Sequence, residues 1–163
     1  MMNRTKITVE PNQLSFKVER TFNAPRDKVF LAMTEKDKLE RWWVGPGYTT
    51  RVEHLDAREG GLWRFIQTGD GWEHGFHGYF HMVSPEMIIQ TFEYDGLDER
   101  GHVTLQKIEL MDIGDGKTKL ISTSVFLSAE DRDGMIHSGM EEGLQYSYSK
   151  LDEILMQDTC QEE

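Results

Sequence analysis

Cysteine is nearly absent from this sequence. Only Cys160 is present, and it lies in a polar C-terminal stretch, residues 157–163. One cysteine cannot form a disulfide framework, and a lone cysteine in a polar tail is a weak candidate for a catalytic nucleophile. Long hydrophobic runs are also missing: no stretch reaches the roughly 18 consecutive apolar residues of a membrane-spanning helix, and the N-terminus has no apolar leader segment. We therefore expect a cytoplasmic protein that does not insert into membranes.

Positive charge is scarce as well. The chain has 18 lysine and arginine residues against 29 aspartate and glutamate residues, which gives a formal net charge of -11. A surface of this sign repels nucleic-acid phosphates and anionic membranes, so neither is an expected partner. Hydrophobic residues make up 37% of the 163 positions, and a chain of this size buries enough apolar surface for one folded domain.

The apolar pattern in the first part of the chain predicts one strand followed by two short helices. Residues 1–13 show no periodicity and are interpreted as a lead-in or an edge segment. Alternation of apolar and polar residues over Leu14–Phe22 is typical of a strand with one solvent-facing side. Pro25 suits the first position of a helix, and Thr34 is a candidate N-cap for a second helix that ends before Gly45-Pro46-Gly47.

Short strands separated by turn residues are expected in the middle of the chain. The two glycines around Asp115 form a strong hairpin signal. Tight turns between successive strands favour an antiparallel meander over parallel strands with crossover helices. The expected strands span residues 49–57, 62–67, 74–83, 87–94, 103–112 and 118–127.

The last regular segment, Asp131–Met156, is predicted to be one long amphipathic helix, with Ser128 as its N-cap. Small residues recur every four positions along one edge of its apolar stripe, although a glycine inside a helix costs roughly 1 kcal/mol relative to alanine. Two explanations are open: the small residues let a strand pass close to the helix, or they leave space beneath it. The stripe consists of Ile136, Met140, Leu144, Tyr148, Leu151 and Leu155, and the small residues are Gly139, Gly143 and Ser147.

These elements predict an α+β fold. We expect a curved antiparallel sheet of about six to seven strands wrapped around the long C-terminal helix, with two short helices after the first strand. A single domain is expected over residues 14–156, preceded by the lead-in of residues 1–13 and followed by the polar tail of residues 157–163.

Aromatic residues alternate along three neighbouring strands, so we expect them on one face of the sheet, opposite the small-residue edge of the helix. Two interpretations are open: ordinary core filler, or flat walls of a cavity for a planar apolar ligand. The tryptophans at positions 42 and 43 would lie near the mouth of such a cavity. The candidate ligand-binding residues are Trp42, Trp43, Trp63, Phe65, Phe76, Phe80, Phe92, Tyr94, Gly139, Met140, Gly143, Leu144 and Ser147.

Histidine and acidic clusters are weaker candidates for chemistry. His77 and His81 share a face of their strand about 13 Å apart, and His74 points the other way. Zinc needs three or four converging ligands, so no metal site is expected. Asp56 and Arg58 share a strand face two residues apart and are interpreted as a charge pair that braces the following turn.

A series of short motifs carries a family resemblance. In their order along the chain they resemble the homologues of the activator of the heat-shock-protein-90 ATPase, within the START-like, helix-grip (Bet v-type) superfamily. The resemblance implies a helix-grip sheet that encloses a hydrophobic cavity, with no shared catalytic residues and no cofactor. The eukaryotic co-chaperones carry an additional N-terminal domain that contacts the chaperone, which residues 1–13 cannot supply. The motifs are Ala24-Pro25-Arg26-Asp27-Lys28-Val29-Phe30, Trp42, Gly45-Pro46, Asp56-Ala57-Arg58-Glu59-Gly60-Gly61, Gly78, Pro85 and Ser138-Gly139-Met140-Glu141-Glu142-Gly143.

Three functions are compatible with this sequence. The leading hypothesis is non-catalytic binding of a small hydrophobic or aromatic molecule in the cavity between sheet and helix. An enzyme of the polyketide cyclase or hydrolase type would need polar groups that converge inside the cavity, for which only Gln90, Glu93 and Tyr148 are candidates. A chaperone- or client-interaction module would need an exposed apolar patch on the convex face of the sheet, and the alternation predicts none.

Overall fold

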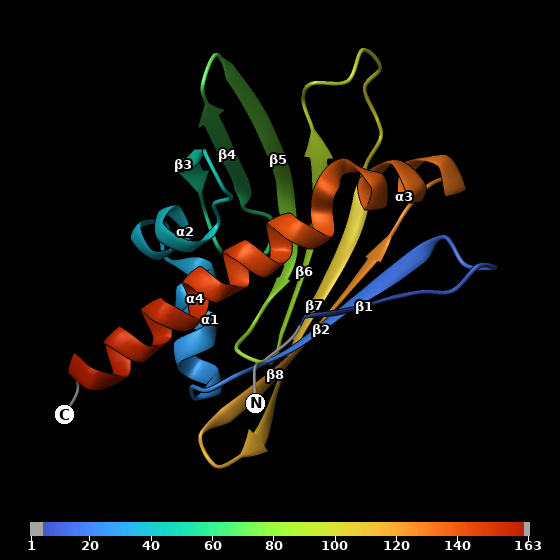
Figure 1. Ribbon diagram of the computed structural model, residues 1–163. Helices are drawn as coiled ribbons and strands as arrows, with labels where there is room; N and C mark the ends of the chain where they lie inside the picture. The colour runs from blue at the N-terminus through green and yellow to red at the C-terminus, as the bar shows by residue number, and fades with distance from the viewer. Residues whose placement is uncertain (1–4, 162–163) are drawn as a thin grey trace.

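The computed structural model describes residues 5–161 and contains one curved sheet with helices on its concave side (Figure 1). Within these residues the sheet has eight strands in the order β1-β2-β8-β7-β6-β5-β4-β3, and every neighbouring pair is antiparallel. The strands are β1 Lys6–Val9, β2 Ser15–Phe22, β3 Thr49–Leu55, β4 Leu62–Gly69, β5 Trp72–Val83, β6 Met87–Tyr94, β7 Thr104–Gly114 and β8 Lys117–Val125.

The α+β class and the sheet around a C-terminal helix are confirmed, but the predicted six to seven strands were too few. The additional strand is β1, which pairs with β2 and places Ile7 opposite Val18. A four-residue strand is too short to show periodicity in the sequence. Its position depends on backbone hydrogen bonds to β2, which supplies a ready edge.

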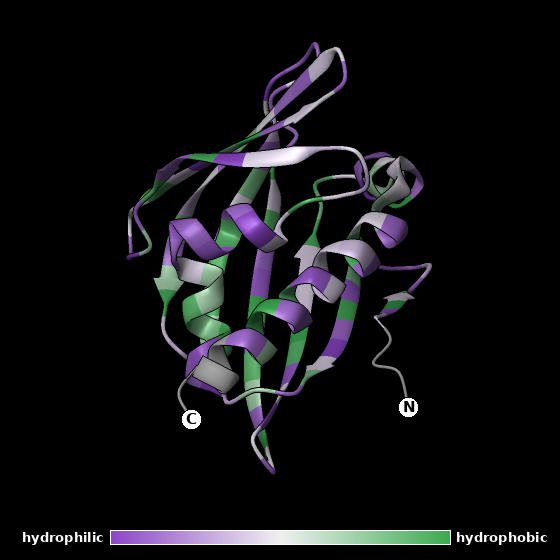
Figure 2. Ribbon diagram, turned by 60° about the vertical axis from the view of Figure 1, so that its left-hand side comes forward, coloured by the Kyte–Doolittle hydropathy of each residue, from purple (hydrophilic) through white to green (hydrophobic). Residues whose placement is uncertain are grey.

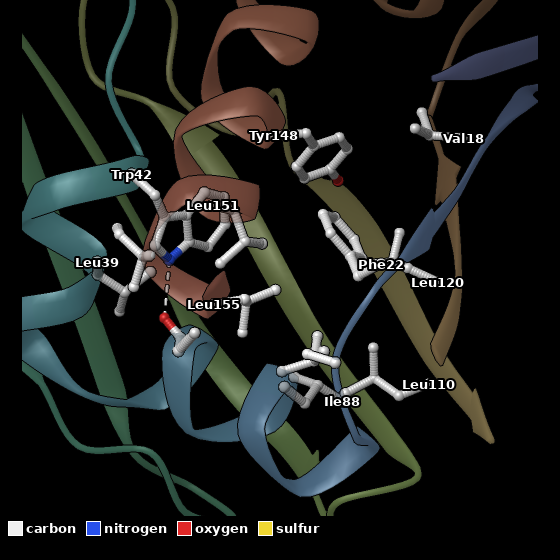
Figure 3. Packing of buried hydrophobic residues seen from close by; sticks show 14 of the residues in the cluster. Val18, Phe22, Leu39, Trp42, Ile88, Leu110, Leu120, Tyr148, Leu151 and Leu155 are labelled. Carbon is white, nitrogen blue, oxygen red and sulfur yellow. Dashed lines mark hydrogen bonds between the residues drawn. The ribbon is translucent and has the colours of Figure 1, made fainter. Parts of the chain in front are cut away.

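The two short helices are α1, Arg26–Thr34, and α2, Lys36–Trp42. Pro25 precedes α1 as its N-cap. The predicted N-cap Thr34 is wrong: Glu35 occupies that position, and the Thr34 hydroxyl donates to the carbonyl of Phe30 one turn back in α1 (2.9 Å). The indole N–H of Trp42 donates to the carbonyl of Ala32 (2.7 Å; dashed line in Figure 3), which holds α2 against α1.

The predicted single helix over residues 131–156 is three consecutive helical segments. These are α3, Ala129–Met135, the π-type turn η1, Ile136–Met140, and α4, Glu141–Gln161. The interruption is at Gly139, whose φ of 85° lies in the left-handed region that glycine reaches without steric cost. Ser128 caps α3 as expected, because its hydroxyl accepts from the N–H of Asp131 (3.1 Å).

The core lies between the sheet and the later turns of α4 (Figures 2 and 3). Leu151 is 0% exposed and Leu155 is 2% exposed. Below them the inner face of the sheet contributes Phe22, Leu110 and Leu120. Because each fully buried side chain of this kind contributes about 1.5 to 3 kcal/mol, this contact holds the helix on the sheet.

A partly buried ion pair joins α4 to the sheet. Arg20 lies two residues from both Val18 and Phe22 on β2 and shares their face of the strand. It therefore faces the core, and it is only 4% exposed. Its guanidinium donates to the carboxylate of Asp152 (2.5 Å) and to the hydroxyl of Thr5 (2.9 Å). Within the described part of the chain, its Nε is a buried donor without a partner.

Candidate functional site

Aromatic rings cover the inner face of β4, β5 and β6. The register places Phe65 opposite Phe76, and Phe76 opposite Tyr94, so the rings form a continuous series across three strands. Ring centroids lie 5.5 Å apart for Phe76 and Phe92 and 5.2 Å apart for Phe76 and Tyr94. Trp63 contacts Phe92 at 5.7 Å. The expected aromatic face is therefore present.

Solvent exposure divides the aromatic candidates into two groups. The first group is buried and acts as core filler: Trp42, Trp63, Phe65 and Phe80. The second group is half-buried, so part of each ring remains open, and we call it the aromatic row: Trp43, Phe76, Phe92 and Tyr94. The buried rings are therefore core filler, whereas a ligand-binding role stays a prediction for the half-buried set.

Trp43 is positioned by the turn that follows α2. Its ring packs edge-on against Phe65 (4.9 Å) and Phe76 (5.5 Å), and its carbonyl accepts a hydrogen bond from the hydroxyl of Thr50. Ser147 is buried, and its hydroxyl donates to the carbonyl of Val44 (2.6 Å). This small residue therefore ties α4 to the segment that carries Trp43.

The candidate residues on η1 and the start of α4 are only partly covered. Met140 and Leu144 are half-buried and pack against the edge of the core. A Cβ added to Gly143 would meet no atom of the described chain within 4 Å. Close strand contact therefore does not explain this glycine. Gly139 is exposed, and its role is the left-handed turn between η1 and α4.

Two glutamines follow the aromatic row on the same face of the sheet. Gln90 shares one face of β6 with Ile88 and Phe92. Ile88 belongs to the core, and Phe92 packs against it. The side-chain N–H of Gln90 donates to the side-chain carbonyl of Gln106, its register partner on β7 (2.9 Å). The sequence predicts Gln90 only as a possible catalytic group and gives no signal for Gln106, because only the β6–β7 register shows that the two side chains meet.

The three candidate catalytic groups are not brought together. Glu93 accepts from the backbone N–H of Gly101 (2.8 Å), and this bond, with help from Arg100, keeps the pKa of Glu93 below its usual range. Tyr148 packs edge-on against Phe22 (5.5 Å), and burial raises its pKa to about 12. Neither group is tuned for proton transfer near neutral pH.

His77 and His74 are held by polar contacts, whereas His81 is exposed. The two ring nitrogens of His77 face the carboxylates of Asp95 (2.7 Å) and Glu93 (3.4 Å), on opposite sides of the ring. His74 contacts the hydroxyl of Tyr94 (2.5 Å). Among residues 5–161, no group of three or more histidine, cysteine, aspartate or glutamate side chains is arranged to hold a metal ion.

The outer face of the sheet carries a shallow hollow of about 390 Å³, lined by Leu62, Arg64, His77, Tyr79, Asp95 and Arg100. Arg64 donates to Asp95 across it (2.5 Å). Burial opposes ionisation of Asp95, but the bonds from Arg64 and His77 outweigh it and hold the pKa of this carboxyl below its usual range. On another part of the surface, Arg58 and Asp56 form the predicted charge pair (2.8 Å).

None of the helices in the described part of the chain is long and apolar enough to cross a membrane. The sequence profile of the family described as "Activator of Hsp90 ATPase homolog 1-like protein" matches residues 23–156. No curated protein matches this chain in sequence.

Solved structures share the fold. The crystal structure of protein Ms6760 from Mycobacterium smegmatis has a TM-score of 0.84 at 20% identity, over 93% of this chain and 96% of that chain. A solution structure of a protein from Arthrobacter aurescens has a TM-score of 0.82 at 25% identity, over 93% and 91% of the two chains. An HSP90 activator from Plasmodium falciparum has a TM-score of 0.65 at 20% identity, over 87% and 96%.

Proposed function

This chain belongs to the family of Activator of Hsp90 ATPase homolog 1-like proteins, and from that premise we propose that it binds a small hydrophobic or aromatic molecule between α4 and the concave face of the sheet. The observation that carries the proposal is the aromatic row. Trp43, Phe76 and Phe92 pack against the buried core, Tyr94 contacts Phe76, and all four remain partly exposed. We expect the protein to act in the cytoplasm and without a cofactor.

The chemistry of this surface suits a planar apolar ligand. A ligand ring that covers Phe76 and Phe92 would remove apolar surface from water at about 25 cal/mol per Å². Offset or edge-on contact with these rings would contribute a further 0.5–1.5 kcal/mol or so. Met140 and Leu144 pack against the core from the helical side and would complete the site there, where the unbranched methionine side chain adapts to ligands of different shape.

A binding role fits these residues better than catalysis. Gln90 cannot act as an acid or a base, and Glu93 and Tyr148 contact other parts of the molecule. The concave face at the aromatic row therefore offers mainly rings and amides, and the His74 imidazole beside it is bonded to the Tyr94 hydroxyl (2.5 Å).

The direct test is native mass spectrometry of the purified protein, in which a co-purifying ligand appears as a defined added mass. The variant Gly143→Leu adds an isobutyl group at a position where a Cβ meets no neighbour, and in the proposed site this group would occupy the space of the ligand. We expect this variant to fold, to melt at a higher temperature and to lose the added mass. The control Tyr79→Ala changes an exposed residue of the outer face and should retain it.

The proposal fails if wild-type protein carries no added mass and binds none of a panel of planar aromatic probes. It also fails if Gly143→Leu and the wild-type protein bind equally well. A clear fall in the melting temperature of Gly143→Leu would indicate a packed interface at this position.

Chaperone contact is a second candidate, favoured by the family and by the P. falciparum neighbour, which is an HSP90 activator. On this chain, the outer-face hollow combines paired charges with Tyr79, which is 52% exposed. Stimulation of the ATPase of a purified Hsp90-type chaperone, reduced by Arg64→Glu and unaffected by Gly143→Leu, would support this role. Absence of stimulation by the wild-type protein would remove it.

A further inference from the structure

This inference rests on the proposed function. We infer that the ligand carries a neutral head group with a hydrogen-bond donor beside an acceptor, such as a carboxamide or a lactam. Gln90 and Gln106 bind this head group through hydrogen bonds. These two side chains lie where the aromatic row ends. Gln90 is two residues from Phe92 on β6, a separation of about 7 Å along a strand. A planar ligand stacked on the row can therefore reach the amides with its end.

The two amides are only partly satisfied by each other. One N–H of Gln90 donates to the carbonyl of Gln106 (2.9 Å). The carbonyl and the second N–H of Gln90, and both N–H groups of Gln106, have no partner elsewhere in residues 5–161. Rotating both amides by 180° reverses the bond but leaves free donors and a free acceptor.

These free groups are open to an approaching molecule. Both side chains are half-buried, and neither contains a fully buried polar atom without a partner. An incoming group that bonds to both amides would replace water at these positions. A purely apolar ligand would instead remove the water and leave the amides unsatisfied, which weakens its binding.

Charge at this position favours a neutral head group. The inner-face neighbours of the pair on β6 and β7 are uncharged: Ile88, Phe92, Thr104 and Ile108. The two buried arginines of the described residues, Arg20 on β2 and Arg132 on α3, already have the carboxylates of Asp152 and Asp133 as partners. A carboxylate or an ammonium group would therefore lose its hydration beside the glutamines without gaining an opposite charge.

Three probes that share one ring system test this inference: 2-naphthamide, 2-methylnaphthalene and 2-naphthoate, titrated by tryptophan fluorescence. For the wild-type protein we expect 2-naphthamide to bind about tenfold more tightly than 2-methylnaphthalene, because it bonds to both amides. We expect 2-naphthoate to bind most weakly. In the variant Q90M/Q106M, 2-naphthamide should lose this advantage, while 2-methylnaphthalene binds at least as well as before.

The outcomes separate this inference from the proposed function. Equal affinity of the wild-type protein for 2-naphthamide and 2-methylnaphthalene would show that the glutamines do not recognise the head group. The proposed aromatic site would remain. An unchanged tenfold preference in Q90M/Q106M would do the same. Failure of all three probes to bind would overturn both proposals. The wild-type comparison needs no variant, so the test stands even if Q90M/Q106M folds poorly.

Discussion

The inward-facing side chains of residues 147–155 on α4 are buried against the sheet, whereas those of residues 136–144, on η1 and the start of the same helix, are only half covered. In the first stretch, Tyr148, Leu151, Ile154 and Leu155 are all at most 6% exposed. In the second stretch, Ile136, Met140, Gly143 and Leu144 remain partly open, although they follow the same helical spacing. Apolar periodicity alone therefore does not decide how deeply a residue is buried.

Two local features separate the stretches. The later turns are fixed by the Arg20–Asp152 ion pair and by the bond from Ser147 to the carbonyl of Val44. The earlier turns begin with a π-type turn and the left-handed Gly139, which redirect the helix before α4. We conclude that the packing of this helix on the sheet is concentrated at residues 147–155.

The largest expected difference between the stretches is the cost of removing a leucine. Leu151→Ala should lower the free energy of unfolding by about 2 to 5 kcal/mol, because the side chain is fully buried and leaves a cavity. Leu144→Ala should cost about 1 kcal/mol, because its side chain is only half-buried. Urea unfolding of both variants measures the difference. Equal costs would contradict the division of the helix.

The ion pair should give the next largest effect. Asp152→Ala leaves the buried guanidinium of Arg20 without its carboxylate, and we expect a loss of about 3 kcal/mol. The matched control is Glu153→Ala, which removes an exposed pair with Lys150 (3.7 Å) and should cost less than about 1 kcal/mol. Adding Arg20→Met to Asp152→Ala should restore much of the stability. If it does not, the pair acts through packing rather than charge.

High pH should weaken the packed stretch through Tyr148. Burial raises the pKa of Tyr148 from 10.0 to about 12, so the folded state holds this proton more tightly than the unfolded state does. The resulting stability is complete below pH 10 and is lost as the pH rises through about 12, by about 2 to 3 kcal/mol in total. Denaturant unfolding of the wild-type protein and of Tyr148→Phe from pH 9 to 12 measures this loss. The two profiles should diverge above pH 10, whereas the control Tyr146→Phe should follow the wild-type protein.

The smallest effects should differ in sign between two glycines. Gly139→Ala forces alanine into a left-handed conformation and should lower stability by about 1 kcal/mol. Gly143→Ala meets no neighbour and should raise stability by up to about 1 kcal/mol through helix propensity. Thermal melts of the two variants provide the comparison. A gain for Gly139→Ala would mean that the kink at this residue relaxes without cost.

Local patterns in the sequence predicted most of the elements. Alternation over residues 15–22, the turn at Asp115 and the Ser128 cap each depend on neighbours within a few positions, and the structure contains all three. The aromatic face was predicted for the same reason, since side chains on a strand alternate with period two. Through these patterns the sequence alone determined the fold class, the sheet-and-helix arrangement and the identity of the rings.

Tertiary structure decided the features that depend on distant partners. The pairing of β1 with β2, the division of the rings into buried and open sets, and the meeting of Gln90 with Gln106 each require a register or a packing depth that no local pattern encodes. The same holds for Gly139, whose left-handed φ ends one helical segment and redirects the next. Glycine permits that conformation but does not require it, so only the packing of the surrounding chain selects it.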